Sequence, residues 1–62
     1  MRSEFAYLID RLDALSRNRV EDLAKGGAKD FAEYKHMAGV ILGLKMAAQE
    51  IEEYGKAYDD ET

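Results

Sequence analysis

The segment that most constrains this chain is residues 36–48, which read HMAGVILGLKMAA. Only His36 and Lys45 carry polar side chains within it. Small residues recur there at every fourth position, at Gly39, Gly43 and Ala47. A helix that is apolar on nearly every side must be covered on more than one side. In a chain of 62 residues, one partner helix leaves part of that surface uncovered, so the segment predicts association with another chain.

The composition favours helices that are stabilised by association. The chain contains no Pro and is rich in Ala, Leu, Glu and Lys, which are strong helix formers. A core built from 62 residues is marginally stable by itself. Because there is no Cys, neither disulfides nor thiolate metal sites can supply the missing stability. We therefore expect an all-α protein that forms oligomers.

The first predicted helix spans about residues 3–25. Its apolar side chains recur at spacings of three and four residues, at Phe5, Leu8, Ile9, Leu12 and Leu15, and continue at Val20 and Leu23. Arg19 stands where the repeat would place an apolar residue. We expect its side chain to snorkel at the edge of the stripe; the alternative is a charge partner in an interface.

The second predicted helix spans about residues 30–56 and is followed by an acidic tail, residues 57–62, which we expect to fray. Gly26 can take the left-handed conformation that ends the first helix. The second helix begins either with Gly27 as its N-cap, or with Asp30 as its N-cap and Glu33 completing a capping box. Because the connection is short, we expect an antiparallel hairpin formed within one chain rather than by exchange between chains.

Two stripes are predicted on the second helix. The main stripe, expected to meet the first helix, is Tyr34, Met37, Ile41, Leu44, Ala48 and Ile51. The oligomer interface is expected on the far side, at Gly39, Val40, Gly43, Ala47 and Tyr54. Two Gly inside a helix each cost about 1 kcal/mol relative to Ala, and close approach of another helix would offset that cost. The predicted fold is an antiparallel two-helix hairpin that associates into a homo-oligomeric bundle.

A weak anion-binding pattern lies at the turn. Backbone N–H groups before a helix can hold a phosphate, and Tyr34 could stack on a nucleotide base. The residues that could bind the anion are Arg17, Arg19, Lys25, Gly26, Gly27 and Lys29. The pattern lacks the spacing of a known nucleotide-binding motif. The favoured interpretation is a hairpin turn with solubilising lysines.

Candidates for catalysis are few. Glu33 and His36 have the spacing found in di-iron helical bundles, but Glu33 falls in the first turn of its helix, where a capping role is the favoured interpretation. His36 is the only histidine, and neither serine has a neighbouring base. We expect a protein without enzymatic activity, cofactor or metal.

The charge distribution argues against nucleic acid. The net charge is −4, with six acidic residues between positions 49 and 62, and there is no basic stripe to neutralise duplex phosphates. We expect no signal peptide, because residues 1–3 lead directly into an amphipathic helix, and no transmembrane span, because the apolar segment is too short to cross a bilayer. We expect a cytoplasmic protein whose partners are itself and another protein.

Residues 26–44 resemble a pattern in small helical proteins of tailed bacteriophages. The matching positions are Gly26, Lys29, Asp30, Phe31, Tyr34, Gly39, Ile41, Gly43 and Leu44; the chain departs from the pattern at Gly27, where Ser is common. The resemblance implies a phage protein in the host cytoplasm or the virion, serving assembly or structure near the head and portal. The alternative is a small inhibitor of host defence that sequesters a nucleotide signal or binds a host protein.

Overall fold

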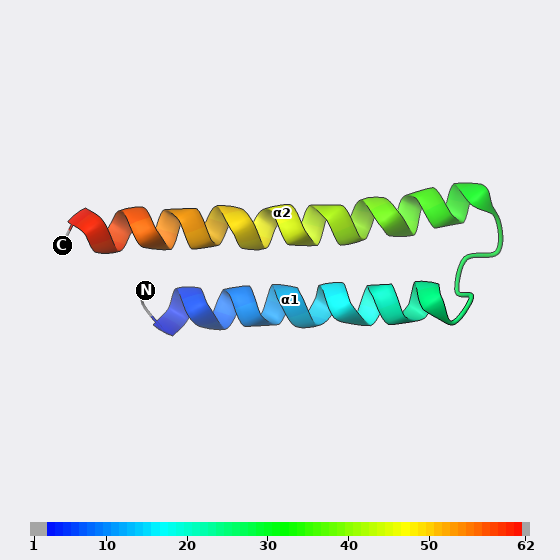
Figure 1. The fold of residues 1–62 in the computed structure, drawn as a ribbon, viewed down its shortest axis with the longest axis horizontal. Coiled ribbons are helices and arrows are strands. Elements are labelled where there is room, and N and C mark those ends of the chain that lie inside the picture. The colour runs from blue at the N-terminus through cyan, green and yellow to red at the C-terminus, as the bar shows by residue number, and fades with distance from the viewer. Residues whose placement is uncertain (1–2, 62) are drawn as a thin grey trace.

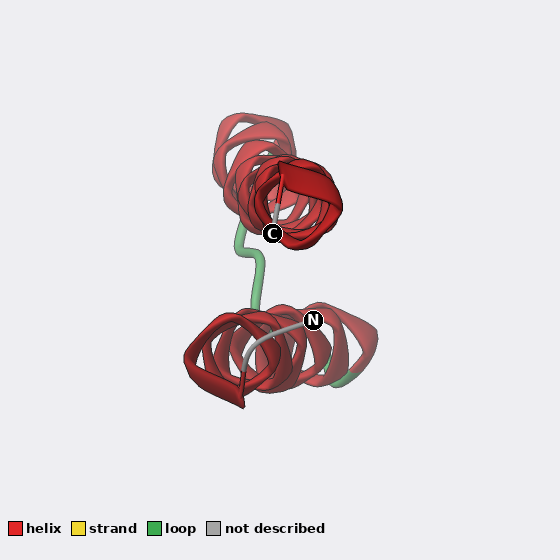
Figure 2. Ribbon diagram, turned by 90° about the vertical axis from the view of Figure 1, so that its left-hand side faces the viewer, coloured by secondary structure: helices red, strands yellow, loops and turns green. Residues whose placement is uncertain are grey.

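The fold is an antiparallel helical hairpin, which confirms the predicted all-α class. In the computed structural model, residues 3–61 are described, and side-chain burial is described for residues 3–58. Helix α1 spans Ser3–Ala24 and helix α2 spans Phe31–Glu61 (Figure 1). Seen end on, the two helices form a single layer with both sides of the pair uncovered (Figure 2). The molecule is accordingly elongated, with extents of 49 × 16 × 11 Å.

The turn between the helices begins with a Schellman motif. Gly26 has φ 83°, the left-handed conformation predicted for it. Its N–H donates to the carbonyl of Leu23 at 3.1 Å, and the N–H of Gly27 donates to the carbonyl of Asp22 at 2.9 Å. A Cβ placed on Gly27 would lie 2.7 Å from that carbonyl oxygen. Both glycines are therefore needed here, Gly26 for its φ and Gly27 for the close approach of the backbone.

Asp30 caps the second helix, which resolves the alternative that the sequence left open. The N–H of Glu33 donates to Oδ1 of Asp30 at 2.8 Å, and the N–H of Tyr34 donates to the Asp30 carbonyl at 3.0 Å. These are the bonds expected of an N-cap residue. The alternative start at Gly27 is wrong, because Gly27 belongs to the end of α1.

The two helices meet along seams with a seven-residue repeat. On α1 the least exposed seam residues are Phe5, Ile9, Leu12, Ser16 and Leu23, and on α2 they are Met37, Ile41, Leu44, Ala48, Ile51, Gly55 and Tyr58. Spacings that alternate between three and four residues keep one line of each helix against the other. The predicted main stripe of α2 is confirmed from Met37 to Ile51. Tyr34 does not belong to it; its ring stacks on Phe31, with centroids 6.1 Å apart.

Small residues are the most buried members of the contact. Ser16 is 5% exposed and Ala48 is 7% exposed, and Gly55 is also buried. The larger seam side chains are only half-buried, and among the described residues no side chain is fully buried. Two helices alone thus enclose a thin core, as a chain of this size predicts.

Helix α2 is longer than predicted. It continues to Glu61 instead of ending near residue 56, so the predicted tail, 57–62, is helical over 57–61. The ring of Phe5 lies 5.9 Å from the Tyr58 ring and 5.5 Å from the Tyr54 ring. These edge contacts with α1 hold the last turns of α2, which local sequence alone would allow to fray.

Candidate interaction surface

One side of the hairpin carries exposed apolar residues from both helices. On α2, Val40 and Ala47 each precede a seam residue by one position, and on α1 Leu8 and Leu15 do the same. A helix turns about 100° per residue, so these side chains flank the seam. Because the helices are antiparallel, the preceding positions of both helices fall on the same side. We call this the apolar side and define it as Leu8, Leu15, Val40, Gly43, Ala47 and Tyr54.

The apolar side is accessible along its whole length. Leu8 is 45% exposed, Leu15 36%, and Val40 37%, and both small residues between them are exposed. A Cβ built on Gly43 would meet nothing within 4 Å. Tyr54 is 60% exposed, although one edge contacts Phe5 of the same chain. The predicted interface residues other than Gly39 therefore share one uncovered surface with two leucines of α1.

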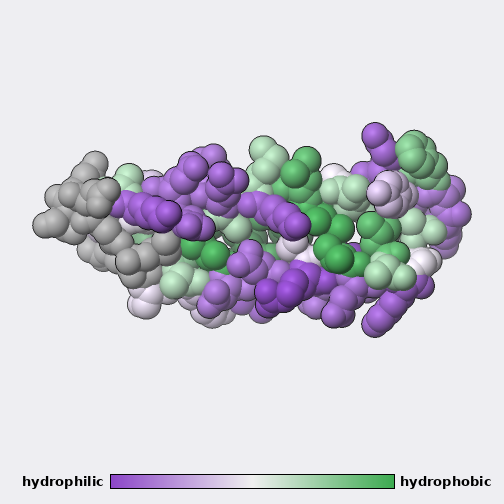
Figure 3. All heavy atoms as spheres, viewed as in Figure 1, coloured by the Kyte–Doolittle hydropathy of each residue, from purple (hydrophilic) through white to green (hydrophobic). Residues whose placement is uncertain are grey.

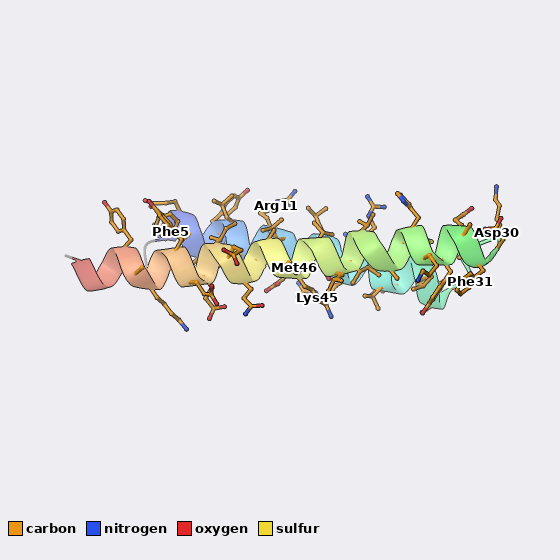
Figure 4. The ribbon with its side chains drawn as sticks, turned by 90° about the horizontal axis from the view of Figure 1, so that it is seen from above. Phe5, Arg11, Asp30, Phe31, Lys45 and Met46 are labelled. Atoms are coloured by element: carbon orange, nitrogen blue, oxygen red, sulfur yellow. The ribbon has the colours of Figure 1, made fainter. Side chains whose placement is uncertain are left out.

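The opposite side of the hairpin is formed by positions that follow the seam residues. We call it the charged side because it carries Asp10, Asp13, Arg17, Lys45, Glu52 and Lys56, although Val20 and Leu42, which are 44% and 59% exposed, lie on it as well. Figure 4 shows Lys45 and Arg11 extending from opposite sides of the hairpin. Nζ of Lys56 lies 3.3 Å from Oε1 of Glu52. The side visible in Figure 3 is hydrophilic toward the end with the chain termini, whereas hydrophobic residues gather across both helices from the middle of the molecule toward the turn.

The apolar stripe predicted on α1 does not simply face α2. Phe5, Ile9 and Leu12 lie in the seam, but Leu8 and Leu15 turn toward the apolar side, and Val20 turns toward the charged side at 44% exposure. A stripe of residues at three- and four-residue spacing covers more than 100° of a helix, which is wider than one contact line. Helix α2 therefore covers only part of the stripe, and the remaining residues lie on the two exposed sides.

Gly39 lies away from the other predicted interface residues. It precedes Val40 and falls further round α2, beside Leu42 and Met46, which are 59% and 58% exposed. Figure 4 shows Met46 directed away from α1. A Cβ built on Gly39 also meets nothing within 4 Å. This residue is thus at the border between the apolar side and the back of α2.

An open hollow lies at the turn end of the apolar side. It has a volume of about 260 Å³ and is lined by Arg19, His36, Met37 and Val40. Nη1 of Arg19 lies 3.9 Å from Oδ2 of Asp22, and both side chains are more than half exposed. Arg19 therefore occupies a seam position with its charged end in solvent, as the snorkelling interpretation predicts.

The turn does not direct its backbone amides toward a ligand. The N–H groups of Gly26 and Gly27 donate to α1 carbonyls, and the Asp30 carboxylate occupies the start of α2. A carboxylate at this position already satisfies the site that an anion would use. The side chains of Arg17, Lys25 and Lys29 are exposed, and the stacking partner of Tyr34 is Phe31.

Among the described residues of one hairpin, Glu33 and His36 are not part of a larger group of metal-binding side chains. The Glu33 backbone takes part in capping α2, and His36 is exposed beside the hollow. Among the described residues, no three His, Asp or Glu side chains converge in a way that could hold a metal ion.

No protein-family model matches this sequence, and no curated protein or solved structure gives a significant match. The resemblance of residues 26–44 to phage proteins therefore stays a prediction. Within the part of the chain that the structure describes, neither helix has the length and apolar character needed to cross a membrane.

Proposed function

We propose that this chain is a non-enzymatic, self-associating protein that buries its apolar side against a second copy and so forms a four-helix bundle. The observation that carries the proposal is the apolar side itself. Leu8 and Leu15 of α1 and Val40 of α2 form one exposed apolar surface. Contiguous exposed apolar surface of this kind is typical of association sites.

The surface area of the hairpin supports the proposal. The single chain exposes 4794 Å², whereas a compact monomer of 7.0 kDa is expected to expose about 4,000 Å². The excess of roughly 800 Å² is similar to the area that each partner buries in a standard protein interface. One further contact surface per chain would therefore remove the excess.

The directions of the two contacts on α2 suit a four-helix bundle. Gly43 and Ala47 precede the seam residues Leu44 and Ala48 by one position, and each is turned about 100° from the seam residue that follows it. In a square bundle each helix has two neighbours at roughly a right angle. The leucines of α1 have the same offset from the seam and point toward the helix of the second copy.

The same proposal assigns the bundle to virion assembly or structure. This assignment rests on the resemblance of residues 26–44 to small phage proteins, which places such chains near the head and portal. An elongated rigid bundle with charged outer sides is a suitable element for binding another protein.

Leu8 and Val20 provide a matched test, because they lie on the same helix with 45% and 44% exposure but on opposite sides of the hairpin. We expect the unchanged chain to sediment as a dimer at micromolar concentration. The double variant Leu8→Glu and Leu15→Glu should sediment as a monomer, since a dimer would bury four added charges. Val20→Glu should remain a dimer.

Analytical ultracentrifugation with native mass spectrometry measures both outcomes. Circular dichroism over a range of protein concentrations detects a variant that no longer folds. A folded, unchanged chain that stays monomeric at high concentration would overturn the proposal, as would a double variant that dimerises as strongly as the unchanged chain.

A further inference from the structure

We infer that the second copy packs with its turn at the same end, so that α2 of one chain lies against α1 of the other. This inference rests on the proposed self-association and specifies its geometry. Two symmetric arrangements bring apolar sides face to face. With the two-fold axis parallel to the helices, unlike helices meet and both turns lie together; with the axis across the helices, like helices meet and the turns lie at opposite ends.

The sizes of the side chains favour contact between unlike helices. The apolar side presents Leu8 and Leu15 on α1, whereas α2 presents Gly43 and Ala47 at its centre. Contact between α1 and α2 of the partner places large side chains over small ones, as interdigitated packing requires. Contact between like helices would set leucines against leucines in one half of the interface and leave the small residues facing each other in the other half.

The contacts within the hairpin fix the register of the two helices, that is, which residues of α1 and α2 lie at the same height along the helix axes. At the open end, Phe5 lies between Tyr54 and Tyr58. At the turn end, Arg19 shares a hollow with Met37 and Val40. Between these ends, α1 and α2 rise equally per residue in opposite directions.

Two pairs follow from that register. Leu15 lies at the height of the interval between Gly43 and Ala47, and Arg11 lies close to the height of Glu50. A two-fold axis parallel to the helices preserves height, so each Leu15 meets the small residues of the partner α2.

Charge complementarity supports the same arrangement. Arg11 and Glu50 are exposed and flank the apolar side, on α1 and α2 respectively; Arg11 is seen on this side in Figure 4. Among the side chains that the structure describes, neither makes an ion pair within the hairpin. When unlike helices meet, Arg11 of each chain approaches Glu50 of the other, which gives two ion pairs per dimer. Arg19 lies nearer the turns, where Asp22 neutralises it.

A spin label at the turn measures the arrangement directly. The chain has no Cys, so Lys29→Cys introduces a single labelling site on an exposed turn residue. We expect double electron–electron resonance to give a label separation much shorter than the 49 Å length of the hairpin. A separation that approaches this length would overturn the inferred arrangement while leaving self-association intact.

Charge reversal tests the pair. Arg11→Glu and Glu50→Arg should each weaken dimerisation roughly tenfold, because each dimer contains two copies of the altered pair. The double variant should recover most of the affinity, whereas Lys45→Glu on the charged side should leave it unchanged. Failure of the double variant to recover would count against the pairing. If both the unchanged chain and the unlabelled Lys29→Cys chain were monomeric, the proposed self-association itself would be overturned.

Discussion

The apolar side and the charged side of this hairpin are built from the same two helices, yet they present different chemistry. Leu8 and Val20 have nearly the same exposure, 45% and 44%. Leu8 shares its side with Leu15, Val40 and Tyr54, whereas Val20 shares its side with Leu42 and with charged residues such as Asp13 and Lys45. Single exposed apolar side chains are ordinary on protein surfaces, and contiguous ones are not. The exposure of single apolar residues therefore does not by itself identify an association surface.

The charged groups of the charged side are satisfied by ion pairs within one helix and by water. Glu52 and Lys56 form an ion pair one turn apart on α2, and the charged ends remain in water. The apolar side has no equivalent, because leucine, valine and alanine gain only by leaving water. In the proposed dimer, the charged side stays in water and the apolar side is covered by the second copy.

Among single substitutions that compare the two sides, Gly43→Leu is expected to weaken dimerisation most. Within one hairpin the added side chain meets open space, so the hairpin itself should remain folded. Against a partner helix it overfills the contact, which typically costs about 1–3 kcal/mol and weakens dimerisation by roughly 5- to 150-fold. Sedimentation equilibrium measures the change in the dimer dissociation constant.

Gln49→Leu is the control for Gly43→Leu, because Gln49 is exposed at a position on α2 away from the apolar side. It adds apolar surface without filling the proposed contact. An equal loss of affinity in both variants, or none in either, would mean that Gly43 does not lie in an interface.

Local features of the sequence predicted the ends of the hairpin well. Gly26 and Asp30 act through bonds to residues within five positions, so Gly26 was predicted to end the first helix and Asp30 was one of the two N-cap candidates. The main stripe of α2 was also predictable, since its apolar period is regular from Met37 to Ile51.

Features that depend on distant contacts were not predicted. Ser16 and Gly55 are buried in the contact between the helices, although neither has the apolar bulk that marks a core residue in a sequence. The extension of α2 beyond residue 56 involves ring contacts with Phe5, nearly the whole chain away. The sequence does not show which part of the broad apolar stripe of α1 is covered by α2, so the exposure of Leu8 and Leu15 could not be predicted.

A smaller effect is expected from Gly39→Ala, which locates the edge of the apolar side. Gly39 lies further round α2 than Gly43, and a Cβ there meets nothing in the hairpin. Replacing Gly by Ala inside a helix typically stabilises it by about 1 kcal/mol, so the free energy of unfolding should rise while dimerisation stays the same. Chemical denaturation and sedimentation measure the two quantities separately. Weaker dimerisation would instead place Gly39 inside the contact and widen the apolar side toward Met46.

The smallest effect is expected from Glu52→Gln, which removes the acidic partner of Lys56 on the charged side. The two side chains are 49% and 67% exposed, and exposed pairs one turn apart contribute about 0.3–0.5 kcal/mol. The free energy of unfolding should therefore fall by a few tenths of a kcal/mol at low salt, and the difference should shrink at high salt because salt screens exposed charges. The dimer dissociation constant, measured on the same samples, should not change. A several-fold change in that constant would show that the charged side takes part in association, and the distinction between the two sides would no longer hold.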